Sequence, residues 1–325
     1  MRPTARIPVL VLVLLAPWSA EIAWGGLPVA DVPLVLLFLA PLYGAAALLV
    51  REVARRTGRG WPTMLLLGAA FGVVQAGVVD QSLFNPAYGR YDFQHPVHVG
   101  GLDISLYYLM AFVSGHVVAS IAAPIAIAEA WSHRGTEAWL TKRAVRAAGL
   151  LYVLASVVNH VGVKADDGRG FQASPLQTAV AVATAAALVG LGLAWRRRPA
   201  TTTRVPAPWL LGALAFVAYL LYLPGEGATA LVVAALVVVA VVTAVGRWSR
   251  STAWTTTHAT ALAVGAFLVG VVAPFLNEPY DPSDGARAEL ASDLVAAAVC
   301  LAVVAATAVR RRALRVAERA VTSAG

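Results

Sequence analysis

A small set of polar side chains interrupts the long apolar stretches of this chain, and these side chains are the ones that could do chemistry. Glu21 and His116 each stand within a run of apolar residues. A carboxyl group in such surroundings needs a proton or a partner, and an imidazole can provide either one. The candidate cavity or binding residues are Glu21, Gln75, Asp80, His116, Ser120, Asn159 and His160. Together they could relay protons or bind a small polar solute or ion.

The elements that must hold these residues are apolar stretches long enough to cross a bilayer. Of the 325 residues, 59% are hydrophobic and 13% are charged, whereas a soluble domain has about 25% charged residues. A membrane-crossing helix needs roughly 20 apolar residues, and these runs lack the two-residue alternation of barrel strands. The sequence therefore predicts an all-α polytopic transmembrane helix bundle of about ten spans, in one integral membrane domain of residues 1–325. The expected spans are residues 7–24, 33–50, 61–79, 104–131, 145–163, 176–195, 208–223, 228–246, 254–275 and 291–310.

The positions of arginine and lysine predict the orientation of this bundle. All but four of the 25 Lys and Arg residues fall at the termini or on alternate connecting segments. The four exceptions are Arg90, Lys164, Arg169 and Arg287. Cytoplasmic segments carry the excess of basic residues, so we expect both termini in the cytoplasm. The first span could instead be a cleaved signal peptide, which would leave nine spans in the same orientation. We favour its retention, because nothing after it resembles the start of a soluble mature chain.

The basic charge of the chain is explained by this topology rather than by a nucleic-acid partner. The net charge is +8 and the pI is near 10.1, and the basic residues flank the expected spans, where they can meet anionic lipid headgroups. The expected partners are the lipid bilayer and an unknown small solute or ion, with no nucleic acid and with the oligomeric state left open. Abundant Ala, Val and Arg indicate a GC-rich bacterial genome, so we expect a bacterial cytoplasmic (inner) membrane.

The motifs predict no cofactor. The chain has no GxxxxGK[ST] phosphate loop and no HExxH motif, and it has a single cysteine, Cys300. His95 and His98 are a weak metal candidate. Imidazoles three residues apart can chelate a metal from a helix, but Pro96 disfavours a helix at this point.

Depth along the expected spans places most candidates near the outer side of the membrane. Glu21 and Gln75 lie in the outer thirds of their spans, and Asp80 lies at the outer end of one. Asn159 and His160 lie near the outer end of another span. His116 lies near mid-depth, and Ser120 shares its helix face.

We therefore expect one polar seam between spans 7–24, 61–79, 104–131 and 145–163, which opens outward beneath the loop 80–103. Each candidate also has a structural interpretation. A buried His or Gln often makes an interhelical hydrogen bond, and Glu21 could extend to the outer interface.

Three functions are compatible with this seam. The leading hypothesis is a small-solute or ion-coupled transporter with an outward-facing polar cavity. It draws on a possible parallel repeat of residues 1–131 and 208–310, in which "GAAFGVV" and "LFNPAY" echo "GAFLVGVV" and "FLNEPY". One alternative is an intramembrane enzyme, a metal-dependent hydrolase or protease that uses Glu21 with His116 or His160. The other is a non-catalytic membrane module that binds a partner through its outer loops.

The enzyme alternative has a partial resemblance behind it. The stretch "REVARRTGRGWPTMLLLGAAFG" (51–72), followed by "QAG" (75–77), resembles the CPBP/Abi family of intramembrane proteases over at most the second to fourth spans. That resemblance would imply two adjacent glutamates on one span and histidines on later spans. Gln75 and Ala76 stand where the glutamates would be needed, so the motif is incomplete and the chain is not assigned to that family.

Overall fold

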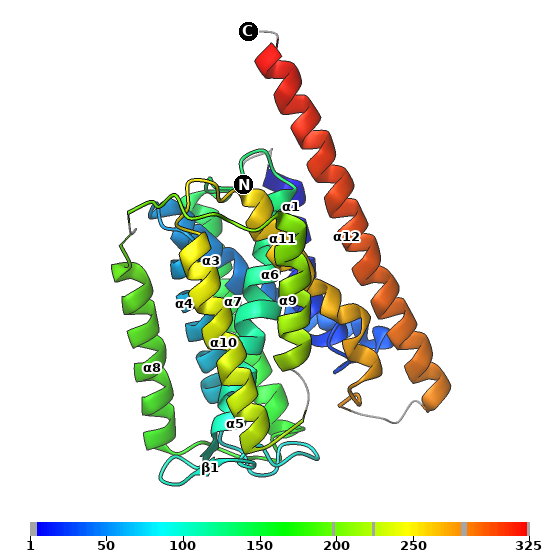
Figure 1. The fold of residues 1–325 in the computed structure, drawn as a ribbon. Helices are drawn as coiled ribbons and strands as arrows, with labels where there is room; N and C mark the ends of the chain where they lie inside the picture. The colour runs from blue at the N-terminus through cyan, green and yellow to red at the C-terminus, as the bar shows by residue number, and fades with distance from the viewer. Residues whose placement is uncertain (1–4, 197–198, 223–224, 281–284, 324–325) are drawn as a thin grey trace.

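The computed structural model describes residues 5–196, 199–222, 225–280 and 285–323, and it is built almost entirely of helices (Figure 1). The α-helices are α1 (Arg6–Pro17), α2 (Val32–Leu34), α3 (Ala45–Arg56), α4 (Trp61–Val74), α5 (Leu106–Gly115), α6 (Ala123–Ala130), α7 (Lys142–Ala165), α8 (Pro175–Ala194), α9 (Pro208–Tyr222), α10 (Ala228–Trp248), α11 (Thr256–Phe267) and α12 (Ala286–Ser323). The π-helical segments are η2 (Trp18–Ile22), η4 (Val35–Gly44), η5 (Gln75–Val79) and η6 (His116–Ala122). The 3-10 segments are η3 (Val29–Asp31), η7 (Leu268–Val271) and η8 (Ala273–Phe275). A two-stranded antiparallel hairpin joins β1 (His98–Val99) to β2 (Ile104–Ser105).

The prediction of an all-α polytopic membrane protein is confirmed. Within the described residues, eight helical stretches are long and apolar enough to cross a membrane. They are Val29–Arg56, Trp61–Val79, Leu106–Ala130, Lys142–Ala165, Pro175–Ala194, Ala228–Trp248, Thr256–Phe275 and Ala286–Ala317. The other two expected spans correspond to shorter apolar helices, α1 with η2 and α9. The expected end of the seventh span, residue 223, lies outside the described residues.

The ends of the helices follow local sequence signals. Ser174 caps α8 through a capping box with Gln177, and Pro175 occupies the first turn, where its missing N–H costs nothing. Thr141 caps α7 by accepting a hydrogen bond from the amide of Ala144. α12 continues far beyond its expected span, 291–310. At 1.5 Å per residue it is about 57 Å long, and it projects past the rest of the bundle (Figure 1).

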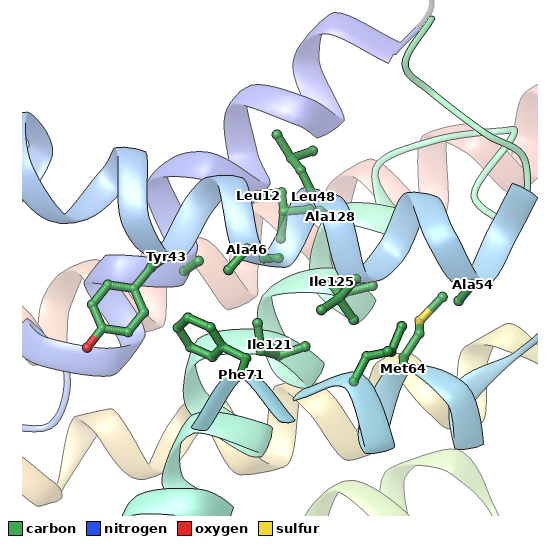
Figure 2. Close-up of a cluster of buried hydrophobic side chains, with 14 of the residues drawn as sticks. Leu12, Tyr43, Ala46, Leu48, Ala54, Met64, Phe71, Ile121, Ile125 and Ala128 are labelled. Atoms are coloured by element: carbon green, nitrogen blue, oxygen red, sulfur yellow. The ribbon is translucent and has the colours of Figure 1, made fainter. Parts of the chain in front are cut away.

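The core lies between α1 and the three membrane-crossing stretches that follow it in the sequence. Leu12, Met64, Ile121 and Ile125 are fully enclosed within one cluster of apolar side chains (Figure 2). Leu42 belongs to the same cluster. The outer helices bury much less of their surface. On α7 and α10, large apolar side chains such as Val161 and Leu236 are 62% and 64% exposed. Lipid is the solvent that can cover such faces, since water would make them costly.

The connecting segments divide between two ends of the bundle. At one end, which we call the arginine face, Arg55 pairs with Glu129 and Arg59 donates to the carbonyl of Leu193. At the other end, the loop face, Asn85 donates to the carbonyl of Gly168 at 3.1 Å. The hairpin lies at the loop face, and the start of α1 and the end of α12 lie toward the opposite side (Figure 1).

Five charged residues form a buried network at the arginine face. Arg51, Glu52, Arg55, Arg56 and Glu129 make up this arginine network. Arg51 and Glu52 are wholly buried, and their side chains meet at 2.9 Å. Because these charges are paired, the second span continues through Arg56 instead of ending near residue 50.

The network also holds the segment between α6 and α7. The amide of Trp139 donates to Glu52 at 2.7 Å, and the amide of Leu140 donates to it at 3.2 Å. The guanidinium of Arg51 lies 3.2 Å from the centre of the Trp139 ring, a cation–π contact. Its Nη2 donates to the carbonyl of Glu137 at 2.8 Å. The arginine network therefore closes this end of the bundle.

Cysteine labelling of the two faces tests the predicted orientation. A cysteine in place of Arg90 at the loop face should react with a membrane-impermeant maleimide added outside intact cells. A cysteine in place of Arg134 at the arginine face should react only after permeabilisation. Both native side chains are accessible, at 38% and 53% exposure, and Cys300 is buried. The opposite labelling pattern would reverse the topology.

Candidate functional site

Four apolar helical segments change from α to π geometry part of the way along. In the described part of the chain, each π segment carries a polar residue whose side chain could take part in binding or proton transfer. Glu21 lies in η2, Tyr43 in η4, Gln75 in η5 and His116 in η6. π-helical insertions are rare and occur frequently at functional sites. Their coincidence with these side chains marks one region of the bundle as the candidate site.

The first part of the site is a hydrogen bond between the first two spans. The hydroxyl of Tyr43 donates to Oε1 of Glu21 at 2.5 Å. Tyr43 is 4% exposed, and Glu21 is partly buried. A short hydrogen bond to a carboxyl is among the stronger ones that a protein makes. Tyr43 was not a sequence candidate, because a tyrosine within an apolar run carries no spacing signal.

An aromatic cluster connects Tyr43 to His116. The ring of Phe71 lies 5.8 Å from that of Tyr43 and 5.3 Å from that of His116, edge-on to both. Figure 2 shows Tyr43 beside Phe71 at one end of the core. The ring centroids of Tyr43 and His116 are 5.8 Å apart. Nδ1 of His116 lies 3.0 Å from the hydroxyl of Ser120, as expected for residues that share a helix face.

Gly72 of α4 allows that helix to pack closely against the segment that carries Val113 and His116. A side-chain carbon on Gly72 would fall 3.1 Å from Cα of Val113 and 3.2 Å from Cβ of His116. A larger residue would push these neighbours apart by a few tenths of an ångström, so glycine favours the close packing of the two spans. Gly72 therefore helps to place His116 next to Phe71.

The second part of the site joins η5 to α7. Nε2 of Gln75 lies 3.3 Å from Oδ1 of Asn159 and 3.4 Å from Oδ2 of Asp80. The other carboxyl oxygen of Asp80 accepts the amide of Ser82 at 2.9 Å. Nδ1 of His160 lies 2.8 Å from the carbonyl of Val79.

Asp80 differs from an ordinary surface carboxylate. It is the first residue after the span Trp61–Val79. Burial raises the pKa of Asp80 to about 6, because the surroundings disfavour its charged form. The hydrogen bonds from Ser82 and Gln75 offset only part of this effect.

The two parts of the site are electrostatic neighbours. Asp80 lies close enough to act on both Glu21 and Tyr43 through its charge. Tyr88 and Tyr280, which lie on two different segments of the loop face, are near both carboxyl groups. A side-chain carbon on Gly26 would fall 2.5 Å from the ring of Tyr280, so this ring is packed directly against the turn after η2.

The structure does not unite all of the sequence candidates around Glu21. In the described part of the chain, neither His116 nor His160 hydrogen-bonds to Glu21. His116 reaches the Glu21 side only through the ring of Tyr43. His160 belongs with Asp80 and Asn159 at the second part of the site.

His95 and His98 lie apart from these groups, on the exposed loop. Their rings are stacked, with centroids 5.1 Å apart. His95 lies 2.9 Å from Asp92, and His98 lies 3.5 Å from Asp103. Within the residues described, no three His, Cys, Asp or Glu side chains are grouped so that they could hold a metal ion.

A small pocket lies on the other side of η2. Its volume is about 20 Å³, and its lining includes Ser19, Val118, Tyr219 and Gly270. This is space for about one water molecule. The hydroxyl of Ser19 donates to the carbonyl of Ala119 here, which ties η2 to η6.

The helices and buried polar residues define a multi-pass α-helical membrane protein. The chain belongs to an uncharacterized membrane protein family, whose model matches residues 10–323. No curated protein and no solved structure matches the chain. Its activity must therefore be argued from its own residues.

Proposed function

We propose that this protein is a cation-coupled transporter of a small solute, in which Glu21 gains and loses a proton. The observation that carries the proposal is the hydrogen bond from Tyr43 to Glu21, made between two π-helical segments within the membrane-crossing part of the chain. An ionisable residue at this depth is costly and is a functional candidate by default.

The hydrogen bond gives proton binding a way to act on the structure. An ionised Glu21 accepts the Tyr43 hydroxyl strongly, whereas a protonated Glu21 is a weaker acceptor and must place its own hydrogen. The bond joins η2 to η4, so a change in the protonation of Glu21 changes the contact between these two segments. His116 and Phe71 pack against the same tyrosine, and the change can therefore reach the fourth span.

The helix geometry supports a transporter in a second way. Transporters commonly bind their substrates and ions where membrane-crossing helices are interrupted. Here four segments change to π geometry around the polar residues, and α11 gives way to the 3-10 segments η7 and η8, of which η8 contains Pro274. The enzyme alternative has less support, because the two histidines do not converge on Glu21.

A liposome assay tests the proposal. The purified protein is reconstituted with a pH-sensitive dye in the lumen, and amino acids, sugars, organic acids and organic cations are added outside one at a time. We expect at least one solute to cause a change of lumen pH that protein-free liposomes do not show. If no solute in the panel changes the lumen pH, proton-coupled transport is contradicted.

A further inference from the structure

We propose that Asp80, Gln75 and Asn159 form a binding site for a monovalent alkali cation at the loop face. The three side chains come from the first residue of η5, the residue that follows η5, and α7. They meet through the amide of Gln75, whose nitrogen contacts both an oxygen of Asp80 and an oxygen of Asn159.

The hydrogen bonds at this point leave an acceptor without a donor. Gln75 is 3% exposed, and its Oε1 has no hydrogen-bond partner in the described part of the chain. Buried amide oxygens are nearly always paired. The nitrogen of the same amide faces two oxygens at 3.3 and 3.4 Å, beyond the ordinary distance of about 2.9 Å.

A cation accounts for both features when the Gln75 amide is turned, a change that moves its nitrogen to the former place of its oxygen. A half-turn of the Gln75 amide would exchange its oxygen and nitrogen. Three oxygens, from Asp80, Gln75 and Asn159, would then face one point, and such an arrangement repels itself unless a positive charge occupies that point. No Lys or Arg of the described residues forms an ion pair with Asp80. The basic residue at this end of α7, Lys164, donates instead to Gln172 at 2.8 Å.

The charge of the site selects the class of ion. Asp80 supplies one negative charge, and the two amides supply none. Divalent sites in proteins usually bring together more carboxylates, as calcium-binding loops do. A single carboxylate with neutral oxygens suits a monovalent ion such as Na⁺ or K⁺.

This inference deepens the proposed function, on which its biological meaning rests, because it names a second cation beside the proton at Glu21 and gives the place of that cation. Its test measures ion binding alone and needs no solute. The two ideas can therefore fail separately. Ion binding without any solute-driven pH change would contradict the transporter proposal and support the cation site. A solute-driven pH change without ion binding would contradict only the cation site.

The experiment is a thermal unfolding series on the purified full-length protein in detergent. The salts are NaCl, KCl and choline chloride at equal ionic strength. We expect Na⁺ or K⁺ to raise the unfolding midpoint in a saturable way, as a ligand of the folded state does, while choline does not. Asp80→Asn should lose this shift. Asp103→Asn, which alters an exposed carboxylate of the same face, should keep it.

A second variant keeps the test decisive if Asp80→Asn does not fold. Asn159→Ala removes one ligand and should move the salt titration to concentrations at least about tenfold higher. Equal midpoints in the three salts, or an ion-dependent shift that Asp80→Asn retains unchanged, would overturn the site. The unpaired oxygen of Gln75 would then belong to a buried water.

Discussion

Replacing Glu21 with glutamine is expected to reduce solute-driven proton movement in liposomes to the level of protein-free vesicles. Glutamine has nearly the shape of glutamate, and its side-chain oxygen can still accept the hydroxyl of Tyr43. It cannot gain or lose a proton. The variant should therefore fold normally while it loses coupling, a combination that a purely structural Glu21 would not produce.

A matched control separates this effect from a general loss of negative charge. Glu278 also lies on the loop-face side, but its side chain is 80% exposed and pairs with Arg90. Glu278→Gln should transport as the native protein does. If Glu21→Gln retains the pH change, or if Glu278→Gln loses it equally, Glu21 is not the coupling residue.

The largest expected loss of stability comes from Glu52→Gln in the arginine network. Glu52 is fully buried and accepts hydrogen bonds from Arg51, Arg56 and the amides of Trp139 and Leu140. Neutralising Glu52 leaves the positive charge of Arg51 buried with one negative partner fewer. Removing one partner of a buried ion pair typically costs about 3–5 kcal/mol, and the free energy of unfolding, measured by denaturant titration in detergent, should fall by this amount.

An exposed ion pair of the same face provides the comparison. Glu137 meets Arg134 at 2.5 Å, but both side chains are largely exposed. Water and salt weaken such pairs, so the free energy of unfolding of Glu137→Gln should be close to that of the native protein. Equal unfolding of the two glutamine variants would show that the arginine network contributes little to stability.

The fold was largely predictable from the sequence, because lipid imposes simple demands on composition. The span expected at 61–79 is the one observed, and 104–131 differs by only a residue or two at each end. The second span was expected to end near residue 50, since Arg51 and Glu52 read as interfacial charges. The pairing of Arg51 with Glu129, which lies far away in the sequence, is a tertiary effect that no local pattern reveals.

The site was predictable in part. Depth along the spans brought Gln75, Asp80 and Asn159 to the same level, and the structure places these three together. Depth carries no information about how each helix is rotated about its own axis. That rotation decides that Glu21 meets Tyr43 rather than a histidine. The π segments also had no sequence signal, because they depend on how neighbouring spans pack.

The most direct test of the central claim is an infrared titration of the purified protein, which needs no substrate. Difference spectra across the pH range report the carbonyl band of each carboxyl group that takes up a proton. We expect a titrating carboxyl band that is absent from Glu21→Gln and that persists in Asp80→Asn, which identifies Glu21 as a group that exchanges its proton. A spectrum that Glu21→Gln leaves unchanged at every pH would contradict the account.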